Sequence, residues 1–430
     1  MSIPYVERQR KSQVSETPDE SGDADLMTNN LVYKQPEALS LAVNRTYNNQ
    51  FFQRNDYSGS KSTTAICDWN TGTSYVNVEN SYLTFKIKSI GGNANFGCGS
   101  AMNIINEIRI RSRSGTELDR VELANLWSQK DSVYSKPDSY LTRMGSAQGF
   151  GPTRDGPTDS ANVVNTTATR FCLPLTVLSP FFRPMKKQLL PPQLASGLRI
   201  ELVFEDFKTA LFQKTATVTG YEISDLRFSV DTVDLTDDTQ RVLNKESAND
   251  GLEYSYERVY TAISQVPSNQ LQLSMQVRKA VSQACFATAL TMDSKQRVNV
   301  EQDSFKTIDF AYKSYQYRLG SLYFPNQRVE TSADDITEAF TLTMATYDKL
   351  RHPYADSSVS VTNYKLGQGI LATSFEKDMS LNMSGLPINN SRVLELNLEY
   401  SAVTAAVDVI VFLQYCAVAR TFIDNVAAAT

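Results

Sequence analysis

Apolar and polar residues alternate with a period of two in many short runs along the chain. Such alternation places every second side chain on the same face and predicts half-buried β-strands. The runs cover residues 81–90, 103–115, 198–207, 221–235, 271–280, 312–325, 393–400 and 405–422. Turn-forming residues separate them, as in GGNANFGCGS at 91–100. The pattern therefore predicts a protein built mainly of strands.

Two segments instead show the spacing of an α-helix, one in each half of the chain. In 116–134 a start signal at Thr116 precedes a partial apolar stripe. In 332–350 acidic residues occupy the first turn, and Ser332 or Asp334 is the expected N-cap. Each half of the chain is thus expected to hold one helix among its strands.

A strand of similar sequence occurs twice. IELVFED at 200–206 and LELNLEY at 394–400 repeat Glu and Leu 194 positions apart. Each half runs strand, strand, helix, long loop and closing strand pair, which indicates two copies of one domain. The predicted parts are an N-terminal arm over 1–40, a first domain over 41–236, a linker helix over 237–250 and a second domain over 251–430.

Many short strands joined by long irregular connections indicate an all-β fold. A doubly wound α/β sheet would need strands and helices to alternate throughout, and they do not. A sandwich or jelly roll, with a few short helices in the loops, fits the pattern. The long loops at 145–166 and 352–390 are expected to be displayed at the surface or to be functional.

Charge narrows the set of partners. The net charge of −5 and the pI of about 5.3 do not suit a surface that neutralises phosphate. No run of five basic residues occurs, so direct sequence-specific nucleic-acid binding is not expected. The most apolar stretch, 402–419, contains Asp408 and is rich in Val, so it is predicted to be a buried strand pair or one long strand and not a membrane span.

The first 40 residues are rich in Ser, Asp, Glu and Thr. They are either a floppy tail or a segment that orders against a neighbouring subunit, and the sequence favours neither. They lack the apolar core of a signal peptide.

Residues that could support catalysis are few. The single histidine, His352, cannot build a multi-histidine metal site. Nucleophile-elbow, phosphate-loop and dinucleotide motifs are absent. The acidic pairs Asp237/Asp238 and Asp334/Asp335 stand where helix N-termini favour negative charge. We therefore predict no enzyme activity, no catalytic, cofactor-binding or metal-binding residues, and no cofactor.

The sequence also contains cysteines and N-x-S/T triplets. The five scattered cysteines (Cys67, Cys98, Cys172, Cys285 and Cys416) are expected to be buried free thiols, which favours synthesis in a reducing compartment. Four N-x-S/T triplets (at Asn44, Asn165, Asn382 and Asn389) are interpreted as coincidental glycosylation motifs because no secretion signal precedes them.

Four segments stand out together: LRIELVFEDF (198–207), YEISDLRFSVDTVDLTDDTQRVLNKE (221–246), YQYRLGSLYFPNQ (315–327) and VDVIVFLQYCAVARTFIDN (407–425). In order and spacing they resemble the double jelly-roll major capsid proteins of icosahedral double-stranded DNA viruses, nearest to those of polinton-like viruses and virophages. In the family such segments form the last two strands of the first roll with its crossover helix, an Arg-Leu-Gly-Ser segment of the second roll, and the C-terminal strand. The resemblance spans about residues 45–425.

The resemblance implies two tandem eight-stranded jelly rolls in one chain and a homotrimer of pseudo-hexagonal outline that tiles an icosahedral shell. Implied partners are other copies of the chain, then minor capsid and penton proteins. Residues 1–40 are expected to contact an internal membrane or a minor protein. The implied location is the virion, with synthesis in the host cytoplasm.

Two other functions are alternatives to the capsid role. A tandem jelly-roll protein for carbohydrate binding or attachment would use the aromatic and proline-rich loops PFFRPM (180–185) and YFPNQ (323–327). A glycoside hydrolase would use two carboxylates across a cleft. The scarcity of histidine and the presence of only two tryptophans weigh against both.

Overall fold

The computed structural model describes residues 42–59, 63–151, 163–214, 217–249, 251–308, 312–332, 335–350, 357–377, 384–400, 405–421 and 426–429. Contacts divide the chain into two compact units, residues 1–43 and 44–430, and the architecture below is that of the second unit. The predicted arm, His352, Asp334, Asn382 and residues 152–162 of the 145–166 loop lie outside the described residues. None of the described helices has the length and apolar character that a membrane span requires.

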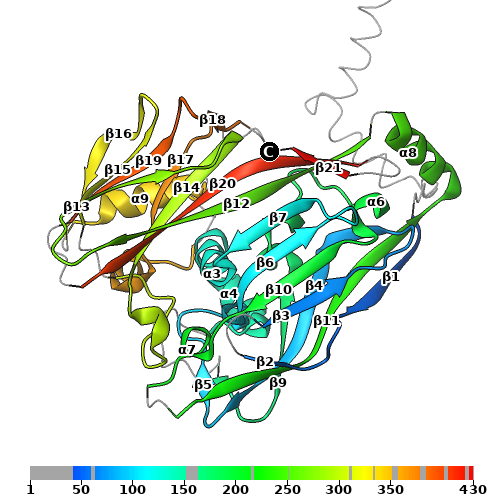
Figure 1. Cartoon of the computed structure of the whole chain (residues 1–430), viewed down its shortest axis with the longest axis horizontal. Coiled ribbons are helices and arrows are strands. Elements are labelled where there is room, and N and C mark those ends of the chain that lie inside the picture. Colours follow the sequence, from blue (N-terminus) through cyan, green and yellow to red (C-terminus); the bar gives the residue numbers. More distant parts are fainter. Residues whose placement is uncertain are drawn as a thin grey trace, which may run out of the picture. The chain divides into compact units, whose positions relative to one another are not determined.

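Four antiparallel sheets, two in each half of the chain, form the framework (Figure 1). The first half has β1 (Ala42–Phe51), β11 (Gly220–Leu235), β4 (Tyr75–Ile90) and β9 (Thr169–Pro174) in one sheet, and β3 (Thr64–Asp68), β10 (Arg199–Phe204), β6 (Ile105–Arg111) and β7 (Glu117–Glu122) in the other. The second half has β12 (Leu252–Val266), β20 (Val407–Thr421), β14 (Val281–Asp293) and β17 (Leu371–Ser374), and then β13 (Gln272–Val277), β19 (Leu394–Tyr400), β15 (Tyr312–Leu319) and β16 (Leu322–Glu330).

The two halves have the same strand order. When the eight main strands of each half are counted along the chain, both halves pair them as 1-8-3-6 in one sheet and 2-7-4-5 in the other. This is the order of a jelly roll, and the predicted all-β fold of two tandem eight-stranded jelly rolls is confirmed. The repeated strands IELVFED and LELNLEY are the cores of β10 and β19, the seventh strand of each roll.

Short strands and helices fill the connections. The minor strands are β2 (Tyr57–Ser58), which pairs with β11, β18 (Leu386–Ile388) with β14, β21 (Val426–Ala429) with β20, and β5 (Ala94–Asn95) with β8 (Val163–Val164). The α-helices are α3 (Ala124–Ser135), α4 (Asp138–Arg143), α5 (Leu175–Leu178), α6 (Pro192–Ala195), α7 (Phe207–Ala210), α8 (Asp237–Asn249), α9 (Thr337–Thr346) and α10 (Val361–Asn363). Single turns are η1 (Ala101–Ile104), η2 (Met144–Gln148), η4 (Pro180–Phe182), η5 (Gln296–Val298) and the π-helical η6 (Tyr364–Gln368).

Aromatic side chains join the two sheets of each roll. In the first roll Trp69, just after β3, meets Phe228 of β11 with ring centroids 5.6 Å apart. In the second roll the Tyr317 hydroxyl donates to the Leu371 carbonyl across the core at 2.8 Å. Such contacts bury large apolar surfaces while satisfying the polar tip of each tyrosine. The apolar stretch near the C-terminus forms the single long strand β20. This is one of the two alternatives that the sequence predicted.

Three predicted elements need correction. The helix predicted over 116–134 begins only at Ala124, because residues 117–122 pair with β6 as strand β7. The helix predicted over 332–350 begins at Thr337, because Ser332 accepts a bond from the Asp335 amide in a separate tight turn and caps no helix. The predicted strand 312–325 is a hairpin that turns at Gly320.

Candidate functional site: the contact between the two jelly rolls

Strand β12 of the second roll packs against β7 and η4 of the first roll. Hydroxyl groups of β12 side chains form hydrogen bonds across this contact. Tyr254 donates to the Phe181 carbonyl at 3.0 Å, and Tyr256 donates to the Leu118 carbonyl at 2.7 Å. Farther along β12, the Thr261 hydroxyl donates to the Glu122 carbonyl at 2.8 Å. The two tyrosines are 1% and 0% exposed, so each removes apolar area from water and also satisfies a buried carbonyl.

A buried ion pair lies in the same contact. Asp119 of β7 has no exposed surface, and Ser179 donates to its carboxylate at 2.5 Å. The Arg258 guanidinium of β12 lies 3.5 Å from the other carboxylate oxygen. Burial raises the pKa of Asp119 to about 6, while Arg258 and Ser179 act in the opposite direction. The pair therefore stabilises the contact only as long as both partners are present.

A second charged cluster lies beside the first. Arg183, which follows η4, donates to Asp131 of α3 at 2.7 Å and lies 4.9 Å from the ring centre of Trp127. Burial raises the pKa of Glu257 on β12; Arg183 lowers it and Asp131 raises it further. Both charged clusters thus join β12 to the first roll.

The glycine-rich loop 91–100 and helix α3 make a third contact. The Cys98 amide donates to the Asp303 carboxylate of the second roll at 2.7 Å. Lys130 of α3 is buried and its ammonium donates to the Gln368 side chain at 2.9 Å. Burial lowers the pKa of Lys130 to about 8, although Cys98 and Asp303 raise it. The loop expected to be an ordinary turn therefore helps to hold the two rolls together.

The raised pKa of Asp119 predicts an unusual pH dependence. The folded-state pKa of about 6 exceeds the ordinary value of 3.8, so the folded protein binds this proton more tightly than the unfolded chain. The stability that binding of this proton adds is absent well above the folded-state pKa and grows as the pH falls toward 4. Between pH 7.5 and pH 5, we expect the wild type to gain about 1.4 kcal/mol relative to Asp119→Asn. Urea unfolding of both proteins at several pH values measures this, and parallel curves would contradict it.

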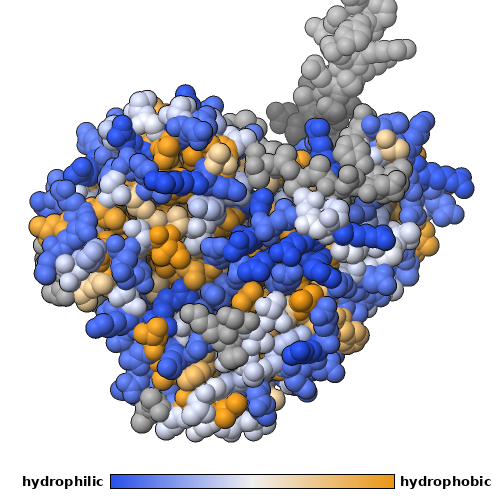
Figure 2. Space-filling view, in the orientation of Figure 1, coloured by the Kyte–Doolittle hydropathy of each residue, from blue (hydrophilic) through white to orange (hydrophobic). Residues whose placement is uncertain are grey.

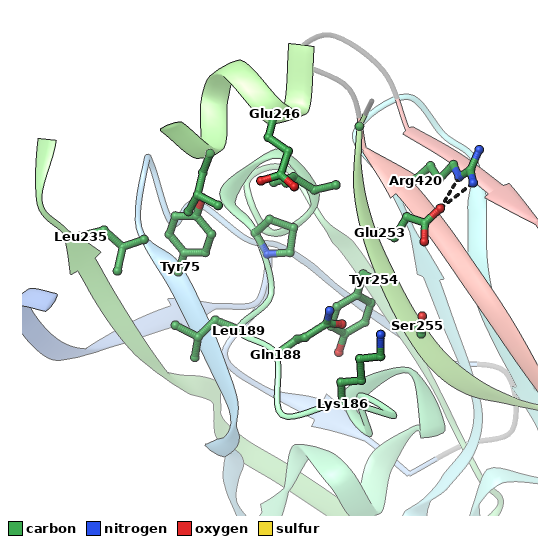
Figure 3. Close-up of a pocket in the computed structure, with 14 residues that line it drawn as sticks. Tyr75, Lys186, Gln188, Leu189, Leu235, Glu246, Glu253, Tyr254, Ser255 and Arg420 are labelled. Atoms are coloured by element: carbon green, nitrogen blue, oxygen red, sulfur yellow. Dashed lines mark hydrogen bonds and ion pairs between the residues drawn. The ribbon is translucent and has the colours of Figure 1, made fainter. Parts of the chain in front are cut away.

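A pocket of about 720 Å³ lies beneath helix α8 (Figure 3). Glu246 enters it from α8, while Glu253 on the far wall is bound to Arg420, with the closest nitrogen at 2.5 Å. Its two aromatic lining residues, Tyr75 and Tyr254, are only 6% and 1% exposed. Neither offers an open ring face on which a sugar could stack, and neither histidine nor cysteine lines the pocket. The pocket thus gives no support to a carbohydrate site or a catalytic site.

The outer face of the sheet β3-β10-β6-β7 carries an ionic ladder. Glu107 accepts bonds from Arg109 and Arg120, both at 2.7 Å, and Glu201 pairs with Arg111 at 3.2 Å. Figure 2 shows this face as a hydrophilic band across β6, β7 and β10. Because basic and acidic groups neutralise one another along it, the face is not a phosphate-binding surface.

The structure shows where the acidic pairs and the cysteines considered in the sequence lie. Asp237 and Asp238 lie in the first turn of α8, where negative charge was expected, and Asp238 is 3.8 Å from Arg241. Asp335 caps no helix, which contradicts the role predicted for its pair. The five cysteines are free thiols; all are buried except Cys172, which is half-buried. Among the described residues no cluster of His, Cys, Asp and Glu could hold a metal ion.

The amino-acid sequence does not reveal the residues that join the rolls. The pattern that begins at Thr116 predicts a helix and so does not reveal Asp119, and the sequence gives no signal for Arg258, Asp303 or Gln368. The run ELDRVE at 117–122 does not alternate in polarity, so nothing in it indicates a strand with a buried acid.

Comparison with known proteins places this architecture in a structural class. No protein-family model matches the chain, and no curated protein matches it in sequence. Solved structures do match over almost the whole chain. PBCV-1 VP54, fitted into a reconstruction of the virophage Sputnik, aligns with a TM-score of 0.59 at 12% identity, covering 93% of this chain and 98% of its own.

Two further matches are named as major capsid proteins. The Faustovirus protein aligns with a TM-score of 0.59 at 8% identity, covering 92% of this chain and 93% of its own. The mavirus protein aligns with a TM-score of 0.53 at 10% identity, covering 92% of both chains. At such low identity these matches show a shared fold. The resemblance to double jelly-roll capsid proteins noted in the sequence is therefore confirmed at the level of the fold.

Proposed function

We propose that this protein is a major capsid protein, a structural component of an icosahedral virion without enzymatic activity. The observation that carries the proposal is the duplication: one chain contains two jelly rolls of identical strand order, joined side by side through β7 and β12. Viral major capsid proteins with the same fold support it.

The capsid role accounts for the duplication in physical terms. Two similar rolls per chain, taken three times around a threefold axis, present six nearly equivalent edges from one closed symmetry. We infer that the chain forms a homotrimer of pseudo-hexagonal outline, and that such capsomers tile the shell. Further partners are minor capsid and penton proteins, and the acidic balance of the chain fits a shell without sequence-specific nucleic-acid contacts.

The proposed domains are those expected from the sequence. The first roll corresponds to 41–236, the linker helix to 237–250 and the second roll to 251–430, and the described strands fall within these limits. Residues 1–40 are proposed as an arm that contacts a minor protein or an internal membrane. The chain is proposed to be made in the host cytoplasm and to reside in the virion.

Light scattering of the purified full-length protein tests the proposal. We expect the mass of three 48.0 kDa chains, and particles of hexagonal outline in negative-stain images of the same fraction. A chain that stays monomeric at high concentration would contradict the capsomer, and binding to immobilised glycans would then favour the attachment protein.

A further inference from the structure

The contact between the two rolls of one chain joins two strands that hold different positions in the order of their rolls. We call this position the rank of the strand. Strand β7 is the fifth strand of the first roll, and β12 is the first strand of the second roll. In Figure 1 they run side by side, and hydroxyl groups of β12 bind carbonyls of β7 at Leu118 and Glu122. The covered residues Leu118, Tyr254 and Tyr256 are 0%, 1% and 0% exposed.

The chain contains a second pair of strands with these two ranks, and both strands carry exposed apolar residues. The first strand of the first roll is β1, and the fifth strand of the second roll is β16. On β1, Tyr47 and Phe51 are 54% and 62% exposed. On β16, Leu322 and Tyr323 are 47% and 44% exposed. In Figure 1 the two strands lie at opposite ends of the view, so one chain cannot bring them together.

The exposed residues of β1 have the chemistry of the covered residues of β12. Phe52 points into the core, with its ring 5.1 Å from Phe228, so its neighbour Phe51 points to the outer face of the sheet. Tyr47 lies on that outer face as well, 6.4 Å from the ring of Tyr82. Tyr254 and Tyr256 also share one face of β12, two positions apart, whereas Tyr47 and Phe51 are four positions apart on β1. Aromatic side chains at these positions favour burial against a partner.

We propose that the outer face of β1 in one copy of this chain docks on β16 of a second copy, repeating between copies the contact that β12 makes with β7 within one. The partner surface is therefore a second copy of the chain, and the contact is head-to-tail because two different surfaces meet. Head-to-tail contacts close into a ring when the rotation between copies permits. This inference rests on the proposed capsomer and names the surface that would build it.

Charge substitutions test the surface. Tyr47→Asp and Tyr323→Asp each place a carboxylate in the proposed contact, at positions that are exposed in the single chain. We expect either variant to fall from the mass of three chains to the mass of one, with thermal unfolding showing a folded protein. The control is Val242→Asp on α8, which is 65% exposed and has no counterpart in a second roll, and it should remain a trimer.

Cross-linking tests the head-to-tail pairing directly. With a short bis-maleimide, the double variant Tyr47→Cys/Tyr323→Cys should give covalent trimers. Neither single variant should cross-link beyond the wild type, whose own cysteines supply the background. A mixture of the two single variants, dissociated and reassembled, should give covalent dimers.

The outcomes separate the inference from the function beneath it. A trimeric wild type whose Asp variants also stay trimeric would overturn the inference and leave the capsomer intact. Cross-linking of Tyr47→Cys alone would show a symmetric contact and overturn it as well. A monomeric wild type would instead overturn the proposed function.

Discussion

Replacing Asp119 with alanine is expected to lower the free energy of unfolding by about 3–5 kcal/mol. Arg258 is only 8% exposed, and without Asp119 its charge would remain in the contact between the rolls with Glu117, 3.8 Å away, as the remaining acid. The Ser179 hydroxyl would also lose its acceptor. Urea unfolding at pH 7 measures the change, with Asp238→Ala as a control because that carboxylate is 95% exposed.

A double replacement distinguishes the buried charge from simple packing. If the uncompensated Arg258 is the cause, Asp119→Leu combined with Arg258→Met should recover most of the loss, because an apolar pair leaves no charge to solvate. Equal and additive losses from the two single changes would show that the two groups act independently. That result would contradict the ion pair as a unit of the contact.

Gly97→Ala is expected to cost about 3–5 kcal/mol. Gly97 has φ +60, a conformation that disfavours any Cβ, and an added Cβ would lie 2.6 Å from the Asp303 carboxylate. That carboxylate cannot easily withdraw, since it accepts bonds from the amides of Cys98 at 2.7 Å and Phe305 at 3.0 Å. Both the backbone strain and the lost contact between the rolls would therefore add to the cost.

Gly72→Ala is the matched control. Gly72 has the same φ of +60, but nothing lies within 4 Å of the position of its added Cβ. Its substitution should cost only the backbone term of about 1–2 kcal/mol. Thermal unfolding of the two variants isolates the contribution of the Asp303 contact, and equal losses would mean that this contact contributes nothing.

The fold could be predicted because its signals are local or repeated. The period-two alternation of LELNLEY appears in β19 as alternating buried and half-exposed positions, and the same strand rank recurs at IELVFED. Helix boundaries were less predictable. Residues 117–122 have a helical apolar pattern, but the free edge of β6 offered ladder hydrogen bonds, and tertiary pairing overrode the local preference.

The candidate site could not be predicted in this way. Asp119 and Arg258 are far apart in sequence, and neither has a neighbour whose spacing indicates a buried pair. The sequence around Gly97 indicates an ordinary turn, whereas the structure places Asp303 of the other roll beside it. Such contacts depend on where the two rolls meet, and no sequence period records that.

Alternation, duplication and composition in the amino-acid sequence were therefore sufficient for the strands, a duplicated all-β domain and the absence of recognisable catalytic motifs, because each depends on neighbouring residues or on a repeat, while the choice of a jelly roll over another sandwich came from the resemblance to capsid proteins. Only the tertiary structure decided that β7 and β12 are covered while β1 and β16 are exposed. The two rolls have equivalent strand orders, so their sequences alone do not distinguish an edge that meets its own chain from one that is exposed. That distinction arises from the single way in which the rolls pack, with the Asp119–Arg258 pair buried between them.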